Sequence, residues 1–428
     1  MRILFLTPQL PYPPRQGTTL RNYNLITNLA TRHEIHLLSF VHSQDEISQA
    51  TPLRQHCQHI ETVLAPSRSP WKRFLSLFLS PLPDMALRLP SAEFGAKLKA
   101  CLEREWFDVV QVEGIEMAQA WMGWKLDHET GLPPLNVRRQ TSNIQYPISI
   151  FDDHNAEYVL QKRAFETDIR HPTRWIAAFY SFIQWKKLSR YEGMICQLAD
   201  GVVAVSEADK QALQRLVPGL EVTVVPNGVD IEFYNAQTST ANSQLAMGYR
   251  SLVFTGKMDF RPNVDAVLWF YREVLPLIQR EVPDVHFYIV GQSPHRRVLH
   301  LADDPAVIVT GYVDDVRPYI AGATIYVVPL RIGGGTRLKV LEAMAMSKAI
   351  VSTSLGCEGF EDLISGQQLL LADTPEEFAR RVIELLDDAP RRERLGRAAR
   401  RFVEERYDWR IIVPRLEQLY ELYSQRSH

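Results

Sequence analysis

The sequence predicts an α/β protein made of two doubly wound domains. Short β-rich runs alternate with amphipathic, helix-like stretches along the whole chain. Most of these runs are continuously apolar, as expected for parallel strands that helices cover on both faces. The length of 428 residues corresponds to two or three domains at roughly 150 residues each. Together these observations favour parallel sheets joined by helical crossovers.

Strand candidates occur in both halves of the chain. The first half holds residues 2–6, 35–40, 62–65, 108–113, 148–151 and 201–205, and the second holds 251–255, 285–290, 306–310, 325–329 and 349–353. We place the domain boundary after residue 216, because Pro218-Gly219 breaks the helix that follows Ser206. This gives domains over 1–216 and 217–405. The last segment, 406–428, has apolar residues at helical spacing and is expected to pack back on the first domain.

Composition and charge exclude several classes of protein. The chain is 46% hydrophobic and 23% charged with a net charge of −2, so no basic excess points to nucleic acid. Four scattered cysteines without a CxxC pair are typical of reduced thiols. The N-terminal apolar run is too short for a signal peptide, and no stretch approaches the length of a spanning helix. We therefore expect a cytoplasmic protein.

Two aromatic, amphipathic segments have alternative interpretations. Residues 71–82 and 175–185 are rich in aromatic and aliphatic side chains and are amphipathic. Such segments can contact a bilayer peripherally, here on the inner membrane face. Packing in the core or between domains is the other interpretation.

The densest functional signal is the strand, glycine loop, helix and strand at residues 325–353. Three glycines allow close backbone approach to a ligand, and the N-terminus of the next helix favours an anion. Cations in the first turn of that helix are unfavourable next to its dipole unless an anion is bound. A solvated glycine-rich turn is the alternative. The loop and first turn comprise Gly333, Gly334, Gly335, Thr336, Arg337 and Lys339.

Glu342 lies on the same predicted helix, away from the buried stripe of Leu338, Leu341 and Ala345. This position places it on the side of Lys339, where it can face a ligand. A carboxylate there can bind both hydroxyls of a ribose. An exposed glutamate that pairs with Lys339 is the alternative.

In the first half, candidate residues follow two strands. His154 comes after a strand end, which is the usual place for functional groups in open α/β sheets. Capping or packing is the alternative for an isolated histidine, and an acidic patch formed by Asp152, Asp153 and Glu157 is another. Gly17 follows the first strand and its prolines, and Arg21 lies one helical turn further on.

The segment GGGTRLKVLEAMAMSKAIVST (333–353), with PNGVD (226–230) and EERYDW (404–409), resembles glycosyltransferase family 4. The resemblance implies a GT-B fold, in which two Rossmann-like domains face each other across a cleft. It implies retaining transfer of a sugar from a nucleotide diphosphate to a polysaccharide, lipid-linked glycan or small molecule. No cofactor and no metal are implied, and the chain contains no D-x-D motif.

The resemblance also implies roles for individual residues. Glu342 becomes the ribose carboxylate, Arg337 and Lys339 contact the pyrophosphate and stabilise the leaving group, and His154 lies near the transferred sugar. Gly17 belongs to a loop that closes on the donor. Further donor contacts are expected from the loop and first helix that follow the first strand of the second domain, at Lys257 and Arg261.

Two departures from the family pattern bear on activity. The family carries two glutamates with seven residues between them, and the first of these positions is Gly334 here. The basic residues after the first strand of the second domain are reduced to Lys257 and Arg261 in FTGKMDFRPNVDA (254–266). A catalytically silent partner subunit and a sugar-nucleotide epimerase are therefore kept as alternative functions.

Overall fold

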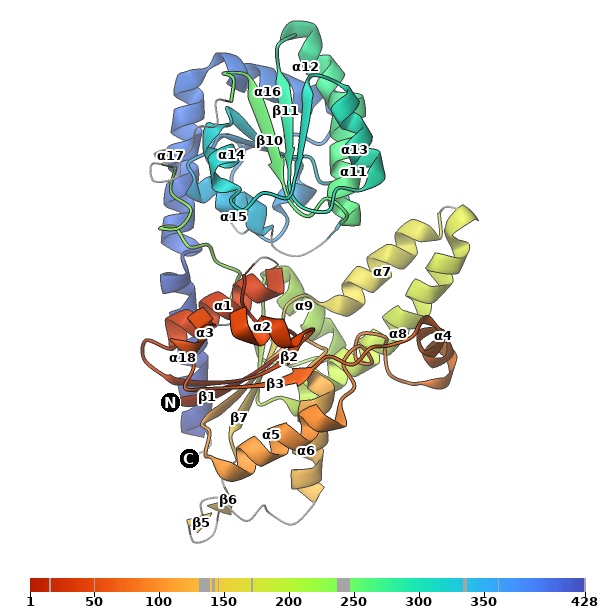
Figure 1. Ribbon diagram of the computed structural model, residues 1–428, viewed down its shortest axis with the longest axis vertical. Helices are drawn as coiled ribbons and strands as arrows, with labels where there is room; N and C mark the ends of the chain where they lie inside the picture. Colours follow the sequence, from red (N-terminus) through yellow and green to blue (C-terminus); the bar gives the residue numbers. More distant parts are fainter. Residues whose placement is uncertain are drawn as a thin grey trace. The chain divides into compact units, whose positions relative to one another are not determined.

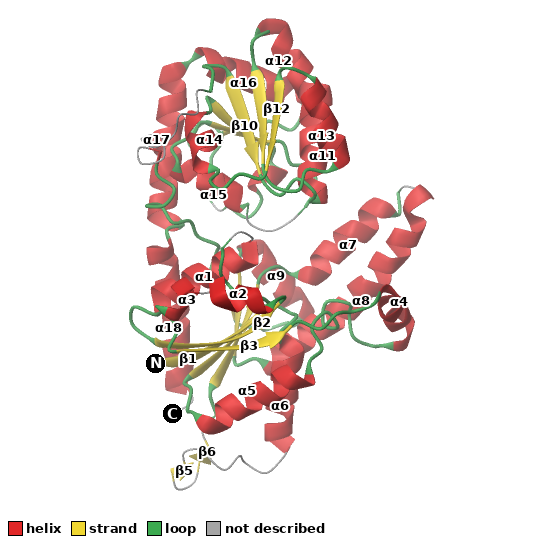
Figure 2. Ribbon diagram, in the orientation of Figure 1, coloured by secondary structure: helices red, strands yellow, loops and turns green. Residues whose placement is uncertain are grey.

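The structure, a computed structural model, describes residues 1–14, 17–49, 51–130, 139–140, 143–144, 146–170, 172–236, 247–333, 337–360 and 362–426. The chain forms two compact units (Figure 1). The first comprises Met1–Pro226 and Val413–His428, and the second comprises Asn227–Ile412. Each unit contains a parallel sheet with helices around it (Figure 2), which confirms the predicted α/β class.

The first unit is built on a seven-stranded parallel sheet in the order β3-β2-β1-β4-β7-β8-β9. Its strands are β1 (Arg2–Thr7), β2 (Glu34–Val41), β3 (His59–Leu64), β4 (Val109–Glu113), β7 (Ile148–Asp153), β8 (Gly201–Ala204) and β9 (Val222–Val224). A short antiparallel pair, β5 (Arg139–Gln140) and β6 (Asn143–Ile144), is separate from this sheet. The helices are α1 (Gly17–Leu29), α2 (Gln44–Gln49), α3 (Thr51–Arg54), α4 (Pro70–Leu79), α5 (Ala92–Arg104), α6 (Ala118–Thr130), α7 (Glu157–Asp168), α8 (Trp175–Leu198) and α9 (Glu207–Leu216).

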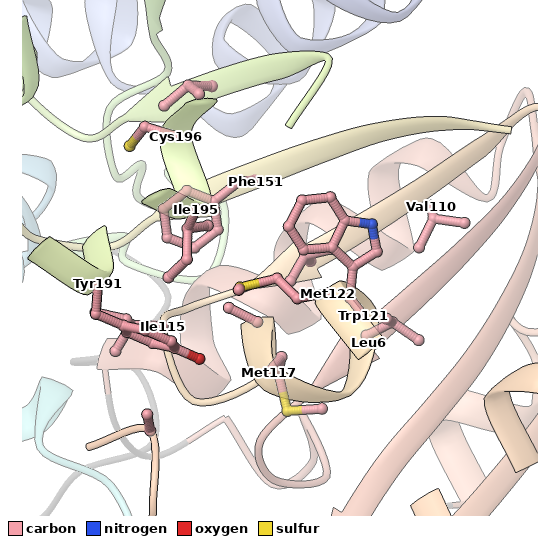
Figure 3. Packing of buried hydrophobic residues seen from close by; sticks show 14 of the residues in the cluster. Leu6, Val110, Ile115, Met117, Trp121, Met122, Phe151, Tyr191, Ile195 and Cys196 are labelled. Carbon is pink, nitrogen blue, oxygen red and sulfur yellow. The ribbon is translucent and has the colours of Figure 1, made fainter. Parts of the chain in front are cut away.

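The core of the first unit explains why its central strands are apolar throughout. Trp121 of α6 is fully buried in one cluster with Leu6, Val110 and Phe151, which come from three neighbouring strands (Figure 3). Helices cover the sheet, so side chains from successive strand positions all enter a dry environment. The ends of these strands are then the places where polar side chains can reach solvent or a ligand.

The second unit has a six-stranded parallel sheet in the order β12-β11-β10-β13-β14-β15. Its strands are β10 (Ser251–Thr255), β11 (His286–Val290), β12 (Val307–Gly311), β13 (Ile325–Val328), β14 (Ile350–Ser352) and β15 (Leu370–Leu371). The α-helices are α11 (Arg261–Trp269), α12 (Leu275–Glu281), α13 (Arg296–Leu299), α14 (Arg317–Gly322), α15 (Leu338–Ala345), α16 (Pro375–Asp387) and α17 (Ala389–Arg406).

The predicted boundary after residue 216 lies too early. Strand β9 pairs with β8, so the chain remains in the first unit until Pro226. The Pro218-Gly219 turn ends helix α9 but only leads into this last strand of the sheet.

The C-terminal segment is divided between the units. Asp408 forms a bridge with Val229, so residues 406–412 belong to the second unit. From Val413 onward the chain belongs to the first unit. Within α18 (Trp409–Arg426), the Tyr420 hydroxyl donates a hydrogen bond to Oε1 of Gln111 on β4, at 3.0 Å.

Candidate active site

In the second unit, Arg337 and the residues around it lie where β13 leads into α15. Arg337 is the N-cap residue of α15, with φ −86° and ψ 90°. Gly333 has φ +122°, and a β-carbon there would lie 3.1 Å from Nη2 of Arg337. The absence of a side chain at Gly333 therefore leaves room for the Arg337 guanidinium. Gly334, Gly335 and Thr336 lie outside the described residues.

Lys339 connects α15 to the loop after β10. Its Nζ donates to Oδ1 of Asn263 at 2.8 Å and lies 4.0 Å from the centroid of the Phe254 ring. A β-carbon at Gly256, which has φ +152°, would lie 2.9 Å from that Nζ. The backbone conformation therefore favours glycine at position 256, and a side chain there would displace the Lys339 ammonium.

The charge at this helix N-terminus is unfavourable without a ligand. Burial and, secondarily, the positive charge of Arg337 lower the pKa of Lys339 to about 7, although the charge of Glu342 opposes this shift. Two cations at the positive end of a helix dipole repel each other and the dipole. A bound anion removes this cost, so the geometry is suited to a phosphate group.

Glu342 follows one turn later on α15. Its Oε1 accepts a hydrogen bond from the Tyr234 hydroxyl at 3.0 Å. Burial raises the pKa of Glu342, while the hydrogen bond from Tyr234 and the charge of Lys339 oppose the rise. The predicted buried stripe was partly wrong, because Leu338 is only part-buried whereas Val340 and Met344 are buried.

Lys257 and Arg261 occupy the neighbouring loop and helix. The Lys257 carbonyl accepts from Nδ2 of Asn263 at 2.8 Å, so the same asparagine contacts Lys257 and Lys339. The Lys257 ammonium is half-exposed and lies 3.5 Å from Asp259. Arg261 is the first residue of α11. The structure therefore joins Lys257 to the α15 site through Asn263.

In the first unit, His154 follows the end of β7. Its Nε2 lies 2.7 Å from Oε2 of Glu113 at the end of β4. Gln111 donates to the other oxygen of that carboxylate at 3.0 Å. Glu113 and Asp152 are register partners on β4 and β7, which brings two buried carboxylates together.

Arg21 of α1 compensates the second of these carboxylates. It is 1% exposed and forms an ion pair with Asp152 at 2.8 Å, and Nη1 donates to the Pro226 carbonyl at 3.2 Å. The alternative of an acidic acceptor-side patch is wrong for Asp152 and Asp153, because both are fully buried. Gly17, the first residue of α1, is exposed one turn before Arg21.

The electrostatic balance favours a charged His154. Burial lowers the pKa of its imidazole, but the hydrogen bond to Glu113 and the charge of that carboxylate outweigh burial and raise the pKa above 6.5. A protonated imidazole next to a carboxylate is a positioned hydrogen-bond donor.

One group within the described residues has the composition of a metal site. Glu113, Asp152 and His154 each offer one ligand atom, and these atoms lie within 4.8 Å of one another. However, Glu113 already contacts His154, and Asp152 already contacts Arg21. A divalent cation would have to replace or repel both of these partners.

Some functional candidates could not be found from the sequence. Asn263 and Tyr234 contact the predicted Lys339 and Glu342 from remote parts of the chain. Glu113 carried one available signal, because it ends the apolar run VVQVE just as His154 follows another strand.

Comparison with protein families identifies the class of protein. Residues 249–388 match the model described as "Glycosyl transferases group 1", and residues 154–233 match "Glycosyltransferase Family 4". The chain belongs to the group 1 glycosyltransferases. This confirms the family 4 resemblance and the predicted class of activity, sugar transfer from a nucleotide sugar.

Individual relatives of this glycosyltransferase are distant. The chain is 22% identical over 95% of its length to an "Uncharacterized 44.6 kDa protein in cps region" of Klebsiella pneumoniae, covering 96% of that protein. It is 27% identical to a phosphatidyl-myo-inositol mannosyltransferase of Mycobacterium tuberculosis over 52% of this chain and 59% of the relative.

Solved structures share the fold of the glycosyltransferase. Sucrose-phosphate synthase from Thermosynechococcus elongatus has a TM-score of 0.70 at 18% identity, with 99% of each chain covered. HepE from Anabaena, in complex with UDP and glucose, has a TM-score of 0.67 at 14% identity, with 98% of this chain and 99% of HepE covered. The fold class is that of the GT-B glycosyltransferases.

Proposed function

We propose that this glycosyltransferase transfers a sugar from a nucleoside diphosphate donor with retention of the anomeric configuration, without a bound metal or cofactor. The observation that supports the proposal is the pair of cations, Arg337 and Lys339, at the N-terminus of α15. These two positive charges repel each other without a ligand, and they complement the negative charge of a diphosphate. As the glycosidic bond breaks, charge grows on the diphosphate, and preorganised cations stabilise it.

The remaining predicted residues take complementary parts in this proposal. Glu342, oriented by Tyr234, holds the ribose hydroxyls. Lys257 and Arg261 extend the donor site, together with Gly334, Gly335 and Thr336 of the loop. His154, held by Glu113, donates to the transferred sugar, and Gly17 is a further donor contact in this proposal.

We propose a glycan or lipid-linked glycan as acceptor, with the protein acting in the cytoplasm at the membrane face. Two relatives support this choice by their names, one in a cps region and one acting on phosphatidyl-myo-inositol. HepE structures with UDP and UDP-glucose make uridine nucleotides the first donors to test.

Thermal stabilisation by a panel of nucleotide sugars tests the donor, because a ligand stabilises the folded state by RT ln(1 + [L]/Kd). The donor that binds is then incubated with glycan and lipid-linked acceptors, and NMR of the product reports its anomeric configuration. Stabilisation by no nucleotide sugar, or an inverted product, would contradict the proposal.

A catalytically silent nucleotide-binding partner is the second candidate. Gly334 favours it, since the family places a donor-facing glutamate at this position. Donor hydrolysis without acceptor distinguishes the two functions. Tight donor binding with neither hydrolysis nor transfer would favour the silent partner, whereas slow hydrolysis favours the enzyme.

A further inference from the structure

Helix α4 and the tip of the α7–α8 hairpin expose an unusual number of large apolar side chains. Within the first unit the hairpin projects beyond the sheet, and α4 lies beside α8 (Figure 1). Trp71 is 73% exposed, Leu79 is 79% exposed and Ile176 is 90% exposed. The apolar residues of this surface are Trp71, Phe74, Leu75, Phe78, Leu79, Ile169, Trp175, Ile176, Phe179 and Phe182. We call this set the aromatic surface.

The exposed rings of α4 are ordered. Trp71 and Phe74 meet edge to face with centroids 6.1 Å apart, and Phe74 and Phe78 do so at 5.7 Å. Spacings of three and four residues place all three on one face of α4. Exposing a helix face of edge-to-face aromatic rings to water is unfavourable in free energy unless something covers that face.

Polar contacts hold α4 against α8 and so fix the aromatic surface as one unit. Lys187 of α8 donates to the carbonyls of Ser76, Leu77 and Ser80 at the end of α4. The Asp84 carboxylate forms ion pairs with Arg68 and Arg73. Its backbone N–H donates to Oε1 of Gln184 on α8 at 2.8 Å.

The charge pattern around the aromatic surface identifies what covers it. Residues 70–82 contain Lys72 and Arg73, and residues 169–187 contain Arg170, Arg174, Lys186 and Lys187. Two of these cations form ion pairs with acidic residues just outside the segments, Arg73 with Asp84 and Arg174 with Asp168. Neither segment contains an aspartate or glutamate, although the whole chain has a net charge of −2. Lys186 lies 4.2 Å from the centroid of the Trp185 ring, so a basic group lies against an aromatic ring next to this surface.

We infer that the aromatic surface docks on a bilayer of anionic phospholipid. Aromatic rings flanked by Lys and Arg match the boundary between acyl chains and negatively charged headgroups. A second copy of the chain is a poorer occupant, because a symmetric contact would bring these cations against their own equivalents. The inference rests on the proposed action at a membrane face and names the part of the molecule that reaches it.

Flotation with vesicles of phosphatidylcholine alone, or mixed with phosphatidylglycerol, tests the inference. The full chain should float with the anionic vesicles and much less with neutral ones, and added salt should weaken the association. Phe74→Asp/Phe78→Asp and Trp175→Asp/Ile176→Asp should each abolish flotation. Arg170→Glu/Lys186→Glu should weaken binding at least about fivefold per cation removed. Tyr249→Asp, at a 98% exposed tyrosine of the second unit, is the matched control and should float normally.

Donor binding, measured in parallel without vesicles, should be equal in all variants. If the wild type binds no donor, the proposed function is contradicted, and the flotation experiment still tests docking on the bilayer. Equal flotation of wild type and the two aspartate variants would overturn the inference. Sedimentation that shows a dimer in the wild type, a monomer in Phe74→Asp/Phe78→Asp and no vesicle binding would overturn it in favour of a second copy.

Discussion

Arg337 tests whether the cations of the α15 site act on the ground state or on the transition state. Charge on the diphosphate grows during bond cleavage, so a group that meets it then should affect the rate more than donor binding. We expect Arg337→Ala to lower kcat by on the order of 10²-fold and to raise the donor KM much less. Arg337→Lys should recover only part of the rate, because a point charge does not replace a planar fork.

Steady-state kinetics with the preferred donor measures the effect of Arg337. Arg331→Ala is the control, since Arg331 lies in the same segment but pairs with Asp265. An unchanged kcat with a raised KM would show that Arg337 contributes uniform binding instead.

Glu342 is expected to bind the nucleoside part of the donor. Removing a charged hydrogen-bond acceptor costs about 1.5–3 kcal/mol, so Glu342→Ala should weaken nucleoside diphosphate binding by that amount in calorimetry. Tyr234→Phe should have a smaller effect, because it removes only the group that orients the carboxylate. Glu281→Ala, at an exposed residue of α12, is the control. Unchanged affinity in Glu342→Ala would remove the residue from the donor site.

His154 should make the stability of the first unit depend on pH. Its folded pKa lies above the ordinary value of 6.5, so its pair with Glu113 stabilises the fold fully below pH 6.5 and loses that effect as the pH rises through the raised pKa. The difference in unfolding free energy between wild type and His154→Gln should therefore be largest at acidic pH and should shrink toward alkaline pH.

Urea unfolding at a series of pH values measures this difference for His154. His42→Gln, at an exposed histidine, should show no comparable trend. A difference that grows with pH would mean that His154 is neutral in the folded protein.

At the scale of elements, α7 begins against a buried carboxyl group. The backbone N–H groups of Glu157 and Tyr158 donate to Glu192 of α8, at 2.7 and 3.1 Å. Burial raises the pKa of Glu192 to about 8, against an ordinary 4.5, although these two hydrogen bonds oppose the rise. The carboxyl group thus joins the two helices of the hairpin and holds a proton at neutral pH.

Linkage gives the direction of the resulting pH effect. A raised folded pKa means that the stabilising contribution of Glu192 is complete below pH 4.5 and is lost as the pH rises through about 8. We expect Glu192→Gln, which keeps an acceptor oxygen without ionising, to lose less stability than wild type between pH 5 and pH 9. Urea midpoints measure this, with Glu207→Gln on α9 as the control. Parallel pH profiles for wild type and Glu192→Gln would be contrary to the expectation.

The elements themselves were largely predictable, whereas their partners were not. Continuous apolar runs predicted the central strands of both sheets, and the glycine segment predicted a helix that carries Lys339 and Glu342, as α15 does. The contact of Lys339 with Asn263 depends on how α15 lies relative to α11, which no local pattern encodes. Periodicity also could not tell whether residues 71–82 face a core or solvent, because an amphipathic helix has the same spacing in both cases.

At the scale of the whole molecule, catalysis is expected to require no metal. The Glu113, Asp152 and His154 group is the one metal-like cluster among the described residues, and its members already form the Glu113–His154 and Asp152–Arg21 pairs. Transfer activity should therefore persist in excess EDTA, as measured by product formation with the preferred donor. Loss of activity that Mg²⁺ or Mn²⁺ restores would contradict this expectation and direct attention to that cluster.

A further property at this scale is whether a helix could span a membrane. No helix in the described part of the chain is long and apolar enough to cross a bilayer.

The discontinuity of the first unit has a consequence for synthesis on the ribosome. The second unit, Asn227–Ile412, is an uninterrupted insertion between two pieces of the first. The sheet of the second unit can be completed before the ribosome has made two residues that the first unit uses. These are Tyr420, whose hydroxyl contacts Gln111, and Glu417, which pairs with Arg32. Folding during synthesis usually proceeds from the N-terminus. Here the first unit begins before the second but is completed only after it, once α18 has been made.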